Sequence, residues 1–377
     1  MSTRNRAAAT VQLGILLLVA SASLTFGQAT RLDPRSTMHI TLPEDSPVTV
    51  VSADWGESTA SARGGAMLLD LHTSLSLRNS GNRKIRSVTL LVQAQEVTPG
   101  GKASVSVPSL NVNPGENFPI RIDLRLLRPL QAGNGPLVEI QLDGVLFDDL
   151  SFYGANKLNC RRSMTVWELE ARRDRQYFRH VLASRGAEGL RSAVLESMNN
   201  QADRMQMDAR IAQSGRSSTT RSERQIEVAF LNPQTSPLAV DQGMVRIAEN
   251  EARSPRLQIR SQTEKPVRGL EIGWMVTDAK GREFVSGGVP MEFSLQPRAR
   301  NTLVQDVTLR FTQPGGSAIT INEMKAYLAS VEFADGSMWI PPHGARGATP
   351  SPEEQRLTEL YRKKGIDALT QELQRFQ

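Results

Sequence analysis

Apolar and polar residues alternate along many short stretches of the chain, most clearly at residues 69–78. Every second position there is Leu or Thr73, and the positions between are polar. Because successive side chains of a strand point to opposite faces, this pattern predicts a strand with one buried and one hydrated face. Turn residues such as Asn113-Pro114-Gly115 and Asp335-Gly336 recur roughly every ten residues, a spacing typical of short antiparallel strands in a β-sandwich.

Each half of the chain also contains a stretch with apolar residues three and four positions apart, which predicts an amphipathic helix. Ser351 with Glu354 fits a capping box, and Pro352 suits a first helical turn. Gly186 and Gly365 are expected to divide each helix into two. The predicted apolar stripes consist of Phe178, Val181, Leu182, Leu190 and Val194, and of Leu357, Leu360, Tyr361, Leu369 and Leu373.

The sequence repeats itself: residues 74–94 lie over 256–276 at a constant offset, which places Arg86 over Arg268. The match continues in the same order into the helices, so a strand-rich unit followed by a helix has been duplicated. We therefore predict a mainly β fold of two tandem immunoglobulin-like antiparallel β-sandwiches, each followed by an amphipathic helical segment. The predicted parts are a signal peptide (1–27), a first β-sandwich (37–154), a helical segment (164–210), a flexible linker (211–223), a second β-sandwich (224–341) and a C-terminal helical segment (351–377).

The first residues are typical of an export signal. Arg4 and Arg6 precede an uncharged stretch that is richest in apolar residues at Leu13–Ala20, and small residues follow. This pattern predicts cleavage after Gly27 or Ala22, with an uncleaved membrane anchor as the alternative. The protein is therefore expected in the periplasm, at the cell surface or outside the cell, with membrane contact only through this segment.

Charge and cysteine content limit the classes of partner that we expect the protein to bind and the ways in which its fold can be stabilised. The net charge of +6 is spread over mixed charges, and an exported chain is a poor match for nucleic acid, so none is expected. The single cysteine, Cys160, can form no internal disulfide, so stability must come from apolar cores. We expect a buried thiol, with an intermolecular bridge as the alternative.

Residues 262–287, and more weakly 79–93, resemble a recurrent exported bacterial module, the immunoglobulin- or fibronectin-type sandwiches of the CARDB and FxLYD kind. The matching residues are Lys265, Pro266, Val267, Leu270, Asp278 and Gly281, and in the first copy Lys84, Ile85 and Val88, where the proline is missing. The resemblance implies a binding or spacer module without inherited active residues. Trp274 falls on the buried face of its strand, as a core tryptophan of such a sandwich would. The C-terminal helices depart from the pattern.

The sequence gives little support for a catalytic or metal-binding site. Asp70, His72 and Ser74 share one strand face, but alternate residues stand about 6.6–6.8 Å apart and project in parallel, whereas a triad must converge. We therefore predict no catalytic, cofactor-binding or metal-binding residue. The same conclusion holds for three further groups: the turn residues Asp148 and Asp149, the scattered histidines His39, His72, His180 and His343, and the methionines Met198, Met205 and Met207.

Two sets of residues remain as candidate contact sites. The basic stretch 172–180 either binds an anionic partner or simply turns its arginines to water. Trp339 is predicted opposite the Phe333 face of its hairpin, and Tyr153 occupies the matched place in the first copy. We expect the following helix to cover each ring, with an exposed stacking platform for sugars as the alternative.

The sequence thus predicts an exported non-enzymatic interaction or structural module of the cell envelope, which works through protein–protein contacts. The alternative is a carbohydrate-binding protein that uses exposed aromatic rings. The expected partner is an envelope protein or a polysaccharide whose identity the residues do not specify, and no cofactor is expected.

Overall fold

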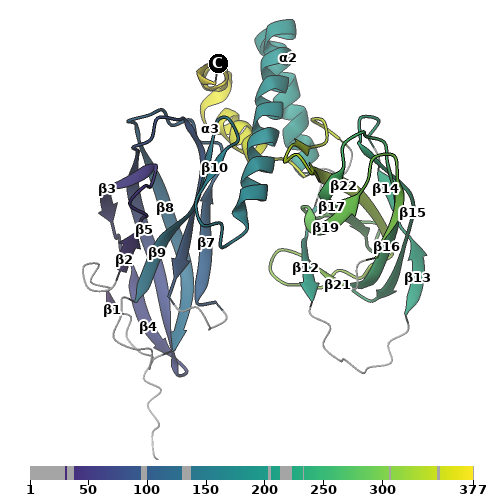
Figure 1. The fold of residues 1–377 in the computed structure, drawn as a ribbon, viewed down its shortest axis with the longest axis horizontal. Helices are drawn as coiled ribbons and strands as arrows, with labels where there is room; N and C mark the ends of the chain where they lie inside the picture. The colour runs from purple at the N-terminus through teal and green to yellow at the C-terminus, as the bar shows by residue number, and fades with distance from the viewer. Residues whose placement is uncertain are drawn as a thin grey trace, which may run out of the picture.

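The structure, a computed structural model, describes residues 30–31, 38–94, 100–129, 137–202, 205–212, 223–231, 233–304, 307–345 and 349–376. The predicted signal peptide and most of the predicted linker lie outside these residues. The described chain is mainly β, with two long helices where the two β units meet (Figure 1). Neither helix carries a stretch long and apolar enough to span a bilayer, within the part of the chain described.

The first β unit consists of two sheets whose inner faces share one apolar core. One sheet has the order β1-β4-β5-β3 with β8 also on β5, and the other has the order β10-β9-β6-β7 with β2 on β9. Leu71 and Leu75 of the first sheet meet Val88 and Leu90 of the second. The strands are β1 (Thr30–Arg31), β2 (Met38–Thr41), β3 (Val48–Asp54), β4 (Thr59–Arg63), β5 (Ala66–Asn79), β6 (Ile85–Gln93), β7 (Lys102–Val107), β8 (Asn117–Pro129), β9 (Val138–Phe147) and β10 (Phe152–Tyr153).

The second β unit repeats this plan with sheets ordered β11-β18-β17-β22-β14 and β12-β21-β16-β15-β13. Trp274 on β17 is fully buried in its core, which confirms the prediction for this residue. The strands are β11 (Met205–Gln206), β12 (Asp208–Ala212), β13 (Arg224–Glu227), β14 (Ala229–Leu231), β15 (Leu238–Ala248), β16 (Glu251–Ser261), β17 (Val267–Thr277), β18 (Glu283–Val285), β19 (Val289–Leu295), β20 (Arg300–Val304), β21 (Thr308–Thr312), β22 (Glu323–Phe333) and β23 (Met338–Trp339).

The sheets were expected to be antiparallel throughout, but three of the described strand pairs are parallel. β2 pairs in parallel with β9, and β14 pairs in parallel with β22 at the matched place of the second unit. β11 also runs parallel to β18. Alternation of apolar residues reports which face is buried and carries no information on strand direction, so the sequence could not distinguish these pairs.

The helices are α2 (Cys160–Ala202) and α3 (Pro352–Arg375). Ser351 caps α3 by accepting a hydrogen bond from the Glu354 backbone N–H at 3.0 Å, as the capping pattern predicted. Gly186 (φ 67°, ψ −167°) and Gly365 (φ 80°, ψ −174°) interrupt the two helices in the same conformation. Glycine reaches positive φ without the steric cost that other residues incur.

The predicted helical segment 164–210 is wrong at both ends. The helix begins earlier, at Cys160, and ends at Ala202, whereas residues 205–212 form β11 and β12 of the second unit. β12 pairs with β21, and Met207 is buried in the second core. Apolar and polar residues alternate from Met205 to Ile211, a strand period that was overlooked when the whole stretch was assigned to the helix.

The apolar stripes of the two helices pack against each other, and this corrects the expectation that each helix covers its own sheet. Phe178, Val181, Leu190 and Val194 of α2 form one buried cluster with residues of α3. The α3 members of this cluster are Leu357, Leu369 and Leu373. Only the first turns of α2 lie on their own sheet, where Cys160 and Met164 pack against Leu146.

Trp339 also lies on the other face from the one predicted. It pairs with Val331 across the hairpin, and the Phe333 N–H bonds the Ser337 carbonyl oxygen, so the loop has three residues rather than two. A one-residue shift in register turns each side chain to the opposite face. Trp339 is therefore half-buried against the second core, and Tyr153 packs in the same way against the first.

Cys160 is buried, and its thiol donates to Asp143 Oδ2 at 3.2 Å. Burial raises the pKa of this thiol to about 12, and the hydrogen bond to Asp143 adds to the rise. Since the thiolate is the reactive form, we expect Cys160 in the native protein to resist iodoacetamide at pH 7.5 and to be fully labelled in denaturant. An added cysteine at the exposed Ser104 position is the positive control. Labelling of Cys160 and of the added cysteine at equal rates in the native protein would contradict the buried placement.

Candidate functional site

The candidate triad residues stay on a hydrated face of β5. His72 lies between two carboxylates, with Nδ1 2.9 Å from Asp123 Oδ1 and Nε2 3.4 Å from Asp70 Oδ1. The His72 side chain is 50% exposed, and its ring nitrogens face these carboxylates rather than Ser74. Asp70 also pairs with Arg125 at 3.1 Å. The arrangement is that of surface ion pairs.

Charged side chains are instead concentrated where α2 and α3 meet. Glu353 of α3 is fully buried; its Oε1 accepts from Arg175 of α2 at 3.2 Å, and its Oε2 accepts from Arg356 at 2.9 Å. Glu168 of α2 is also buried. Its Oε1 lies 2.8 Å from the guanidinium of Arg172, 3.4 Å from that of Arg175 and 3.6 Å from that of Arg86. This set of ion pairs, the buried ionic network, joins both helices to β6 of the first unit.

The helices contact both β units. Arg162 of α2 lies 3.5 Å from Glu271 and 3.8 Å from Glu332, both in the second unit. At the end of α3, the Asn111 side-chain amide of the first unit donates to the Arg375 carbonyl oxygen at 3.3 Å. Each β unit is therefore fastened to the helical junction by more than its own covalent connection.

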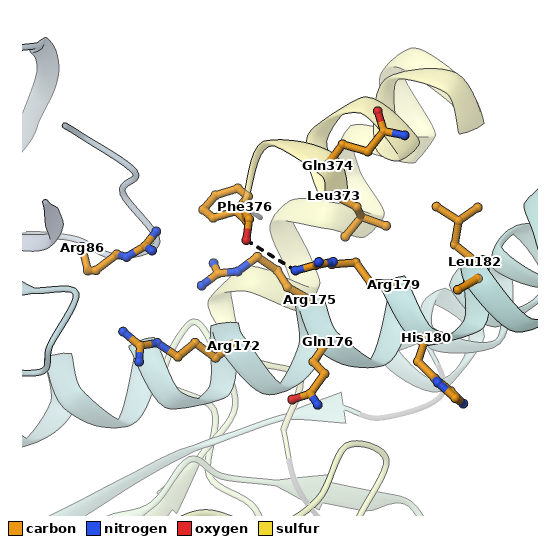
Figure 2. Close-up of a pocket in the computed structure, with 11 residues that line it drawn as sticks. Arg86, Arg172, Arg175, Gln176, Arg179, His180, Leu182, Leu373, Gln374 and Phe376 are labelled. Carbon is orange, nitrogen blue, oxygen red and sulfur yellow. Dashed lines mark hydrogen bonds between the residues drawn. The ribbon is translucent and has the colours of Figure 1, made fainter.

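A pocket of about 800 Å³ opens beside the buried ionic network (Figure 2). Four arginines line it and no acidic residue does, within the part of the chain described. Arg86 reaches in from β6, Arg172, Arg175 and Arg179 come from α2, and Phe376 follows α3. We call this the arginine pocket; its remaining lining is Gln176, His180, Leu182, Ala183, Leu373 and Gln374.

The arginines differ in how far they are neutralised. Arg175 is buried, pairs with two glutamates and stacks on the Phe376 ring at 4.2 Å. Arg179 is exposed, and its guanidinium donates to the uncharged Phe376 carbonyl oxygen at 3.4 Å. Burial lowers the pKa of Arg86; Glu168 opposes that effect, and the positive charges of Arg175 and Arg172 add to it. Positive charge in the pocket thus exceeds what the neighbouring carboxylates balance.

A second cluster lies on the other side of the junction. Asp174 is fully buried, and its oxygens accept from Arg173 at 2.7 and 3.0 Å, from His343 at 2.9 Å and from Ser351 at 2.5 Å. Burial alone would raise the pKa of Asp174, but the hydrogen bonds from His343 and Arg173 outweigh it and hold the pKa below its usual value. The cluster ties α2 to the segment that leads into α3.

Asp174, His343 and Glu354 offer ligand atoms within 4.8 Å of one another, close enough in principle to share a metal ion. The fit is poor. Both Asp174 oxygens are already occupied by protein donors, and the cationic Arg173 lies against them. Glu354 Oε1 accepts from Ser197 at 2.5 Å. A divalent cation would have to displace these donors beside a fixed positive charge, so we interpret the cluster as a structural latch.

Glu170 faces the same cluster from α2. Burial raises the pKa of Glu170 to about 7; Arg173 opposes the rise, while Asp174, Glu271 and Glu354 add to it. An acid whose folded pKa is raised contributes stability at low pH that is lost as the pH climbs to the folded value. We therefore expect Glu170→Gln to raise the Tm by about 2–4 °C at pH 8 and to leave it nearly unchanged at pH 5. The exposed Glu359→Gln is the control, and equal effects at both pH values would contradict the expectation.

The basic stretch 172–180 was predicted as a candidate contact for an anionic partner, but the pocket that it lines was not predicted. Arg172, Arg175 and Arg179 follow helical spacing, so their common face could have been inferred from the sequence. Arg86, Phe376 and the buried ionic network could not, because they meet the helix only through tertiary packing.

No family model and no curated protein matches the chain. Among solved structures, red sea bream transglutaminase is 7% identical, with 76% of this chain and 29% of that chain covered and a TM-score of 0.13. Vicilin from Corylus avellana (hazelnut) is 10% identical, with 88% and 95% covered and a TM-score of 0.08. The chain spans less than a third of the transglutaminase. Likenesses this low carry no argument about fold or activity.

Proposed function

We propose that the protein is an exported, non-enzymatic interaction protein of the cell envelope, in which two immunoglobulin-like sandwich units act as one body and contact a partner protein. The observation that supports this most is the helical junction, where α2 and α3 bury a shared apolar cluster and contact both units. A simple tether would need neither that cluster nor a buried ionic network. A fixed spacing between two β units is useful when both touch the same partner.

The residues with candidate chemistry fit this proposal, because they lie in surface ion pairs or in donor-saturated clusters. The carbohydrate-binding alternative has less support. Trp339 and Tyr153 are both half-buried against cores, and the Tyr153 hydroxyl donates to Asp45 at 2.6 Å. Core contacts therefore cover part of each ring and leave less of its surface for a sugar to stack on.

The proposal is tested by affinity capture from envelope extract on the immobilised chain, beside Glu353→Ala, which removes a buried carboxylate of the junction, and Glu359→Ala as an exposed control on the same helix. We expect one protein to be retained by the wild type and the control and lost by Glu353→Ala, with both β units still folded by circular dichroism. A glycan array is run in parallel. Saturable glycan binding that Trp339→Ala abolishes without loss of stability would favour the carbohydrate-binding alternative.

A further inference from the structure

We propose that the arginine pocket binds an acidic peptide segment of a partner protein, with carboxylates of the segment on the guanidinium groups of α2. This rests on the proposed function and specifies the chemistry of the contact. The pocket is built from both helices and from β6, and Arg86 enters it as a half-buried guanidinium from the sheet. Its wall therefore exists only when the junction is assembled.

The charge of the pocket indicates an anion. Arg172, Arg175 and Arg86 share one Glu168 oxygen, and only Arg175 has a second carboxylate, that of Glu353. The buried Nε of Arg86 lies 3.6 Å from Glu168 and has no hydrogen-bond partner among the described residues. Arg179 adds a guanidinium that donates to a carbonyl oxygen. Guanidinium groups bind carboxylates through two parallel hydrogen bonds, and a bound carboxylate would relieve the repulsion between them.

The spacing of the arginines favours an extended peptide. Arg172 and Arg179, the most exposed pocket arginines of α2, lie about 10 Å apart along the helix axis, since each residue rises about 1.5 Å. Alternate side chains of an extended chain are about 6.6–6.8 Å apart, so three acidic residues at alternate positions cover about 13 Å and span that interval. From Arg172 to Ala183 the pocket follows α2 for roughly 16 Å, the length of about five extended residues.

The apolar part of the lining distinguishes a peptide from a bare anion. Leu182, Ala183 and Leu373 close one end of the pocket, and the Phe376 ring lies over Arg175. Inorganic phosphate would leave this surface unused. A segment with apolar side chains between its carboxylates would cover it, so the lining suits an alternating acidic and apolar sequence.

Arg172 and Arg175 belong to the buried ionic network, whereas Arg179 has no ion pair among the described residues and is not needed to hold the helices together. At the offset that superposes the two helices and places Phe178 over Leu357, the residues Arg172, Arg175 and Arg179 lie over Ser351, Glu354 and Thr358. The stripe residues of the two helices are apolar at the matched places, so the apolar contact between the helices does not involve Arg179. The arginines are therefore a feature of one copy only, as expected of a binding site added to a duplicated scaffold.

The test uses the purified full chain and a capped synthetic peptide, Asp-Leu-Asp-Leu-Asp, with binding measured by isothermal titration calorimetry. We expect saturable binding that weakens as salt is added, because the contacts are ionic. Arg179→Gln should weaken it about tenfold, since Arg179 is exposed and its loss leaves the fold intact. The matched control is Arg185→Gln, the same change at an exposed position of the same helix outside the pocket, and it should leave the affinity unchanged.

Four outcomes would overturn the inference: no binding, equal affinity for the amide peptide Asn-Leu-Asn-Leu-Asn, equal loss in both variants, or binding of inorganic phosphate or phosphatidylglycerol vesicles in place of the peptide. The proposed function fails separately. If peptide binding is absent while Glu353→Ala still abolishes capture of the partner, only the arginine pocket has been misassigned.

Discussion

Replacing Glu353 by Ala is expected to destabilise the helical junction by about 3 kcal/mol or more. The carboxylate is fully buried and is shared by Arg175 of α2 and Arg356 of α3. Its removal leaves Arg175 with a 3.4 Å contact to Glu168, which two other arginines share, and with the uncharged Phe376 ring, so the positive charge in the interior is no longer balanced. Removing one partner of a buried pair costs more than the pair contributes, because the remaining charge stays desolvated.

The effect is measured by urea unfolding followed at the helical circular dichroism band. The control is Glu359→Ala, the same change on the same helix, where the carboxylate is exposed and pairs with Lys363 across one turn. Exposed pairs of this kind contribute little, so the control should unfold like the wild type. A Glu353→Ala variant as stable as its control would show that the buried ionic network does not hold the helices together.

Replacing Trp274 by Ala is expected to cost about 3–5 kcal/mol in the unfolding of the second β unit. Trp274 is the largest side chain with no exposed surface, and it lies where both sheets of that unit meet. The cost combines the lost transfer free energy of the ring with the cavity that the packed neighbours cannot fill.

Trp274→Phe should cost far less, because the buried indole N–H has no hydrogen-bond partner among the described residues. Phenylalanine removes that unsatisfied donor while keeping most of the apolar volume. Both variants are compared by denaturant unfolding followed at the strand band of the circular dichroism spectrum. Equal costs for Phe and Ala would show that the N–H has a partner and that its loss matters as much as the cavity.

The features that were correctly predicted depend on local patterns. Gly186 and Gly365 interrupt segments with a helical period, which predicted the helix breaks, and Ser351 three residues before Glu354 predicted the helix cap. The alternation of apolar residues along its strand predicted that Trp274 is buried. Each of these signals lies within one element, where side-chain period and backbone preference act directly.

The features that were missed depend on contacts between elements. The Trp339 face was set by a loop of three residues instead of two, which a sequence with Asp335-Gly336 does not decide. An apolar stripe predicts that one face of a helix is buried, but not which element buries it. The α2–α3 pairing therefore could not be distinguished from packing of each helix on a sheet. The arginine pocket forms only where α2 and α3 pair, so it could not be predicted from the sequence either.

The central claim, that the helices hold the two β units in one arrangement, is tested most directly by the distance distribution between spin labels on the two units. The labels go on Thr49→Cys and Ser294→Cys, both exposed, in a Cys160→Ser background. Units held by the helical junction should give one narrow distance peak, which broadens when Glu353→Ala is added. A broad distribution in the parent chain, unchanged by that substitution, would contradict the claim.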